Sequence, residues 1–161
     1  MLDKLSSYNI FNYLLPGVLF AVLAEALTAF HFVQKDIVVG VFVYYFIGLV
    51  VSRLGSILIE PVMKWTRFVQ FAPYADFVSA SKNDSQLLIL SEANNMYRTF
   101  CALFVSLGLL KGYEALSARY AELQSWGAEA LGVVLLVLFC FSYRKQTKYI
   151  TKRVQASKEQ A

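Results

Sequence analysis

Long uninterrupted apolar runs are the feature that most constrains the fold of this chain. They cover approximately residues 13–32, 37–59, 99–116 and 126–143, and about 20 apolar residues suffice for a helix to cross a bilayer. The 161 residues are 58% hydrophobic and 16% charged, which is too apolar for an ordinary soluble domain. We therefore expect an all-α, polytopic membrane protein with four transmembrane helices, a small helical cytoplasmic layer and an oligomeric assembly.

The segments between the apolar runs define the expected organisation. Residues 1–59 would form an N-terminal interfacial segment and a first transmembrane hairpin, and residues 60–98 a cytoplasmic amphipathic helical region. Residues 99–143 would form a second transmembrane hairpin, and residues 144–161 a basic cytoplasmic tail.

Within the cytoplasmic region, prolines and a capping sequence predict three helices. Pro61 is expected to end the second transmembrane helix. Short helices are expected over residues 62–71 and 74–81. Asp84 and Ser85 can accept first-turn amides of a longer helix, which would continue directly into the third apolar run.

The distribution of Lys and Arg predicts the orientation. With both termini in the cytoplasm, three of the fifteen basic residues would lie outside, namely Lys35, Lys111 and Arg119. The other twelve would face the cytoplasm: Lys4, Arg53, Lys64, Arg67, Lys82, Arg98, Arg144, Lys145, Lys148, Lys152, Arg153 and Lys158. This bias follows the positive-inside rule, so we expect a multi-pass protein of a bacterial inner membrane.

Small residues occur at four-residue intervals near the end of the second run. Gly48, Ser52 and Ser56 have the spacing at which helix backbones approach closely in lipid, and we assign them to packing between subunits. Arg53, Ser56 and Glu60 form a polar stripe on the same helix. Arg53 is either a lipid-facing anchor or part of a ligand site joined to the membrane helices.

Glu25 is expected near the middle of the first span. A charged side chain at bilayer depth costs about 2.5–3.5 kcal/mol on insertion scales, so it should face protein or water. Its helical neighbours include Ala21 and Thr28. These three residues could line a pore that attracts cations or a proton-coupled binding site, or Glu25 could be a protonated, hydrogen-bonded acid within the bundle.

Basic residues alternate with aromatic residues on the expected cytoplasmic side. The candidate ligand-binding set is Arg53, Lys64, Arg67, Arg98, Arg144, Lys148 and Lys152. Cations beside aromatic rings suit ligands that carry phosphates and bases. Retention by the positive-inside rule and contact with anionic lipids would explain the same pattern.

The sequence gives no support for an enzyme. It has no Ser/His/Asp set and no glycine-rich phosphate loop. Cys101 and Cys140 lie apart within apolar runs and read as small buried hydrophobes, and His31 reads as an interfacial residue. We expect no cofactor and no metal.

In its overall plan, the chain resembles the membrane subunits of Hailong-type bacterial anti-phage systems. The resemblance covers the four-span layout and the basic cytoplasmic layer, without a diagnostic motif. It implies a tetrameric ion channel that is held closed by a cytoplasmic nucleic-acid ligand, a DNA oligomer made by a partner nucleotidyltransferase.

Two other classes of protein are compatible with the sequence. Small multidrug exporters also have four spans and a glutamate in the first, but they are shorter and lack an insertion like residues 60–98. A proton-coupled exporter using Glu25 is one alternative. A non-conducting membrane anchor for a partner protein is the other.

Overall fold

The computed structural model describes residues 2–158, with side chains for residues 12–120 and 122–158, and over that range the fold is all-helical. The elements are α1 (Leu2–Leu27), α2 (Ile37–Leu54), the π-helical turn η1 (Gly55–Ile59), α3 (Glu60–Trp65), α4 (Tyr74–Asn83), α5 (Gln86–Arg119), α6 (Ala121–Ser125) and α7 (Gly127–Lys158). The expected all-α class is confirmed.

Three helices in the described range are long and apolar enough to cross a membrane. They are the continuous helix Ile37–Trp65, formed by α2, η1 and α3, together with α5 and α7. The apolar part of α1 covers Asn12–Leu27, which is shorter than the other three. Less than a quarter of the most apolar window of each long helix is buried inside the chain. These surfaces indicate a helical membrane protein.

The first helix ends earlier than expected. We predicted a span to residue 32, whereas α1 ends at Leu27. The Thr28 hydroxyl donates to the Ala24 carbonyl and accepts from the Phe30 amide, while the Glu25 carboxylate accepts from the Val33 amide. These side chains take the hydrogen bonds that would extend the helix, so residues 28–36 form a loop instead.

The second long helix does not stop at Pro61, contrary to our prediction. It passes through η1, where the Glu60 amide donates to the Gly55 carbonyl five residues back, and continues to Trp65. A π turn widens the helix by one residue. Pro61, which lacks an amide hydrogen, is therefore accommodated at the start of α3.

The helices of residues 60–98 were partly predicted. The helix expected over residues 62–71 is already finished at Trp65, and the one expected over 74–81 is α4, two residues longer. Asp84 accepts from the Gln86 amide at 2.8 Å and begins α5, as predicted, although Ser85 makes no side-chain cap bond. The expected boundaries at 59/60, 98/99 and 143/144 all fall inside continuous helical segments.

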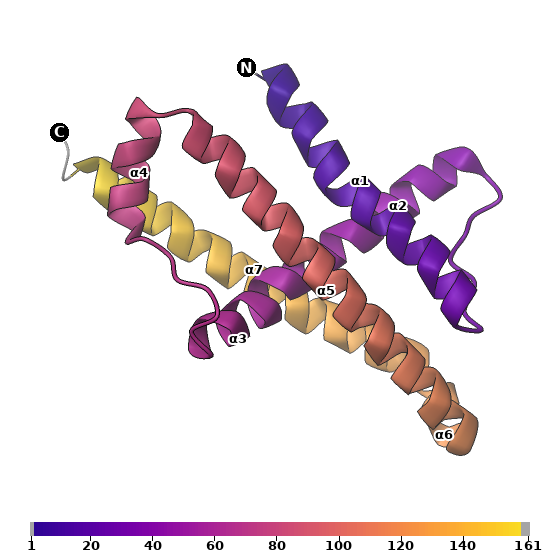
Figure 1. The fold of residues 1–161 in the computed structure, drawn as a ribbon. Coiled ribbons are helices and arrows are strands. Elements are labelled where there is room, and N and C mark those ends of the chain that lie inside the picture. The colour runs from indigo at the N-terminus through magenta and orange to yellow at the C-terminus, as the bar shows by residue number, and fades with distance from the viewer. Residues whose placement is uncertain (1, 159–161) are drawn as a thin grey trace.

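The helices comprise one crossing pair, α1 and α2, and two long helices, α5 and α7, that converge at one end. In Figure 1, α1 crosses α2, while α5 and α7 are long helices that meet at α6. The π turn η1 contacts both α5 and α7. Helix α4 packs on the C-terminal part of α7. The arrangement places the beginning of α3 between α5 and α7.

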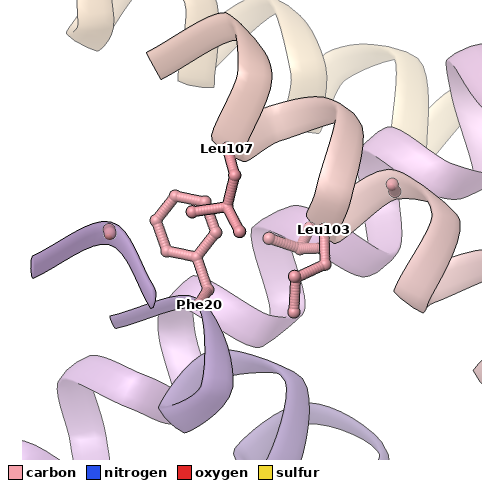
Figure 2. Packing of buried hydrophobic residues seen from close by; sticks show 6 residues of the cluster. Phe20, Leu103 and Leu107 are labelled. Atoms are coloured by element: carbon pink, nitrogen blue, oxygen red, sulfur yellow. The ribbon is translucent and has the colours of Figure 1, made fainter. Parts of the chain in front are cut away.

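The buried core lies where α1, α2 and α5 meet. Phe20 of α1 faces Leu103 and Leu107 of α5, as Figure 2 shows. Val51 of α2 and Ala102 of α5 also belong to the buried cluster. This apolar core fixes η1 and α3 against α5, because η1 follows Val51 by only one helical turn.

Candidate functional site

Glu60 is the centre of the most highly charged contact in the described part of the chain. Its side chain is only 7% exposed, and three cations surround its carboxylate. The distances are 2.8 Å to Lys64 Nζ, 2.6 Å to Arg98 Nη1 and 3.4 Å to Lys145 Nζ. A nearly buried carboxylate needs such partners to remain ionised.

The three cations come from three different helices. Lys64 lies one turn beyond Glu60 on α3, Arg98 lies on α5 and Lys145 lies on α7. Their combined charge exceeds that of Glu60 by two, so the cluster keeps a net positive charge. Arg98 Nε is buried without a hydrogen-bond partner in the described residues. We call Glu60, Lys64, Arg98 and Lys145 the Glu60 cluster.

A small cavity opens beside the Glu60 cluster, between the second long helix and α7. Its volume is about 20 Å³, and its lining residues are Arg53, Ser56, Ile57, Ser142, Lys145, Gln146 and Tyr149. Such a volume holds about one water molecule. The lining offers two cations together with hydroxyl and amide groups, which is a donor set suited to an anion.

Aromatic groups lie next to these cations. The Lys145 ammonium is 5.8 Å from the centre of the Tyr149 ring, which packs on Tyr74 of α4 at 5.9 Å. The Lys64 ammonium lies 4.1 Å from the centre of the Phe71 ring. Arg53 donates from Nη2 to the Tyr13 hydroxyl of α1 at 3.3 Å. The site therefore connects all the long helices through polar side chains.

The structure brings together part of the predicted basic set. Arg53 lies at the cavity, and Lys64 and Arg98 belong to the Glu60 cluster. The remaining four are exposed residues that do not line the cavity, namely Arg67, Arg144, Lys148 and Lys152.

Lys145 and the central role of Glu60 were missed by the sequence-based prediction. On α7 the packed residues Leu138, Ser142, Lys145 and Tyr149 follow a helical repeat of three and four, whereas Arg144 and Lys148 belong to the exposed face. That repeat was a signal available in the sequence. The four-residue spacing of Glu60 and Lys64 was another.

The small-residue stretch has local partners within the chain. A Cβ atom on Gly48 would lie 1.7 Å from the Tyr13 carbonyl oxygen, and one on Gly17 would lie 1.7 Å from that of Tyr44. Gly48 therefore packs against α1 of its own chain. Ser52 is half-buried, and the carbonyl of Ser56 accepts from Lys145 at 2.5 Å.

The residues predicted to line an ion pathway also have partners within the chain. Ala21 is fully buried, and the Thr28 hydroxyl donates to the Ala24 carbonyl. The Glu25 carboxylate accepts from the Val33 amide at 3.0 Å and lies 3.8 Å from His31 Nδ1. Glu25 thus holds the loop after α1 in this structure.

Helices suited to a membrane and a basic cluster at their junction define the protein as a helical membrane protein with a candidate anion site. No family of known proteins, no curated protein and no solved structure matches the chain. Among the residues that the structure describes, no group of three or more His, Cys, Asp or Glu side chains could hold a metal ion.

Proposed function

We propose that the protein is an oligomeric, channel-like effector of the bacterial inner membrane, opened or closed by a negatively charged cytoplasmic ligand. A nucleotide or DNA oligomer supplied by a partner nucleotidyltransferase is the proposed ligand, and phage defence is the proposed setting. The setting, the partner and the preferred tetramer rest on the resemblance in overall plan. The ligand class rests on the basic cavity as well.

One observation carries the proposal. Arg53 and Lys145 line one cavity, and Lys145 also contacts the carboxylate that joins α3 to α5. An anion at that cavity would attract both cations and compete with Glu60 for Lys145. Binding would then act directly on the junction of three apolar helices, which is the differential contact that ligand control requires.

The extensive apolar surface supports the oligomeric part of the proposal. Only a small part of each long helix is buried in the single chain, and large apolar side chains such as Phe42 and Phe46 on α2 and Leu109 on α5 are exposed. In a membrane this surface contacts lipid or other copies of the chain. Four spans with both termini cytoplasmic remain the topology we propose, with α1 as the shortest span.

Binding of an oligonucleotide is expected to depend on salt through two named cations. Each phosphate neutralised on a single strand contributes about 0.7 to the slope of log Kd against log salt. Arg53→Met and Lys145→Met should each weaken binding of fluorescent hexathymidylate and lower the slope by about 0.7. The measurement is fluorescence anisotropy of the detergent-solubilised protein over a range of salt concentrations.

Arg119→Met is the matched control, because Arg119 is an exposed cation at the far end of α5. It should leave both the affinity and the slope unchanged. Binding that does not respond to salt, or equal slopes in all variants, would remove the cavity from the proposal.

A further inference from the structure

The π turn leaves one backbone carbonyl without its usual partner. In a regular α-helix the Glu60 amide would donate to Ser56, four residues back. Here it donates to Gly55. The next amide that a π turn would offer to Ser56 belongs to position 61, which is a proline and has no amide hydrogen. The Ser56 carbonyl can therefore be satisfied only from outside the helix.

Lys145 of α7 supplies that hydrogen bond. Its ammonium donates to the Ser56 carbonyl at 2.5 Å and lies 3.4 Å from the Glu60 carboxylate. One side chain thus satisfies the carbonyl that the π turn exposes and pairs with the acid that immediately follows the turn. Without the Lys145 hydrogen bond, the Ser56 carbonyl would be unsatisfied. A hydrogen bond from the Glu60 amide to that carbonyl would then stabilise the α-helical register.

We propose that Lys145 is a latch that holds the second long helix in its π register, and that an anion in the adjoining cavity releases it. The anion draws the ammonium away from Ser56, and the Glu60 amide then bonds to the freed carbonyl. The turn becomes α-helical, and α3 rotates by about 100°, the angle of one residue. The release step rests on the proposed function, whereas the latch does not.

The rotation would change the contact between the long helices. Glu60 would leave the face that meets Arg98 and Lys145, while Lys64 would move with it because both lie on α3. The link between α3 and α5 is then lost. Single π turns are often found at functional sites, and a change of register gives two discrete states instead of a gradual deformation.

Pro61 helps to keep the helix in the π register when no anion is bound. In the α register, the Pro61 ring would meet the carbonyl of Ile57, four residues back, so the proline favours the π register. The cavity of about 20 Å³ has room for about one water molecule while Lys145 remains on Ser56. An anion that enters this cavity meets the Lys145 ammonium directly, because Lys145 lines it.

The test measures the rotation of α3 by pulsed electron resonance between two spin labels. Trp65→Cys on α3 and Tyr143→Cys on α7 are exposed labelling sites, and Cys101→Ala and Cys140→Ala remove the native thiols. The full chain is placed in nanodiscs of phosphatidylcholine. Hexathymidylate is the soluble phosphate probe, and nanodiscs containing phosphatidylglycerol test lipid headgroups as the source of the anion.

In Lys145→Met, the distance between the two spin labels should differ from that of the parent protein by several ångströms, without hexathymidylate or phosphatidylglycerol. Lys145→Arg, which keeps a charged donor at this position of α7, should keep the distance of the parent protein. Arg153→Met, a loss of charge on the exposed face of α7, should keep the distance of the parent protein. In the parent, hexathymidylate or phosphatidylglycerol should produce the new distance.

The outcomes separate the latch from the proposed function. A parent distance in Lys145→Met would overturn the latch. Hexathymidylate that binds with the expected salt slope but leaves the parent distance unchanged, with phosphatidylglycerol equally silent, would overturn release by an anion. If hexathymidylate does not bind at all, the proposed function fails, and a shifted distance in Lys145→Met still supports the latch.

Discussion

Glu60→Gln is expected to lower the free energy of unfolding by about 2–3 kcal/mol. The amide keeps the shape of the side chain but removes the negative charge that Lys64, Arg98 and Lys145 share. Removing one partner of a buried ion pair costs about 3–5 kcal/mol. The cost is reduced here because the three cations retain 21–42% side-chain exposure. Unfolding of the purified protein in mixed detergent micelles measures the difference.

Glu122→Gln is the matched control for this variant, since Glu122 is exposed on the short helix α6. It should change the free energy of unfolding by less than about 0.5 kcal/mol. A Glu60→Gln protein as stable as the parent would show that the ion pairs of Glu60 do not stabilise the fold. Other contacts would then have to hold α3, α5 and α7 together.

Gly48→Ala is expected to destabilise the protein by about 2 kcal/mol. The added Cβ would lie 1.7 Å from the Tyr13 carbonyl oxygen and 2.6 Å from its carbon, so α1 and α2 must move apart. Overpacking of this kind costs about 1–3 kcal/mol, or more where backbone atoms are involved. The thermal unfolding temperature of the detergent-solubilised protein should fall accordingly.

Gly108→Ala on α5 provides the comparison. A Cβ atom there would meet nothing within 4 Å, so the better helix propensity of alanine should stabilise the protein by up to about 1 kcal/mol. Equal unfolding temperatures for the Gly48 and Gly108 variants would contradict the close crossing of α1 and α2. A Gly48 variant that keeps its stability but loses its oligomeric state would support the original prediction that Gly48 lies at the subunit interface.

Most of the helical framework could be predicted from local signals. Three apolar runs became helices with spanning length, and Asp84 marked the start of α5 because a carboxylate beside free first-turn amides acts locally. The end of α1 depends partly on a long-range contact, since Glu114 of α5 accepts from the Ala29 amide at 2.8 Å. A local pattern does not contain that contact, and the first helix was predicted too long.

Pro61 shows why a reliable local rule failed. A proline normally ends or kinks a helix because it lacks an amide hydrogen and its ring meets a carbonyl of the preceding turn. Here η1 changes the hydrogen-bond pairing, and Lys145, 89 residues away from Ser56, satisfies the carbonyl that would be left over. The compensation comes from tertiary structure, which sequence spacing near Pro61 does not reveal.

The candidate site was predictable in its chemistry and less so in its membership. Positive charge beside aromatic rings indicated an anion site, and Arg53, Lys64 and Arg98 were named. On α7, however, Arg144 was chosen in place of Lys145, because exposed bases spaced by four residues look as regular as the packed face. Which face of a long, mostly exposed helix meets its neighbours depends on tertiary contacts, here those with η1 and α4.

The most direct test of the proposed function is cation flux through the protein in liposomes, with hexathymidylate supplied on the side that we propose to be cytoplasmic. We predict a flux in the parent protein that falls when the oligonucleotide is added, and in Lys145→Met a flux that is low from the start and does not respond to the oligonucleotide. An absence of flux under both conditions would contradict the channel and favour a membrane anchor. Transport that requires a proton gradient and is lost in Glu25→Gln would also contradict the channel, and would favour a proton-coupled exporter.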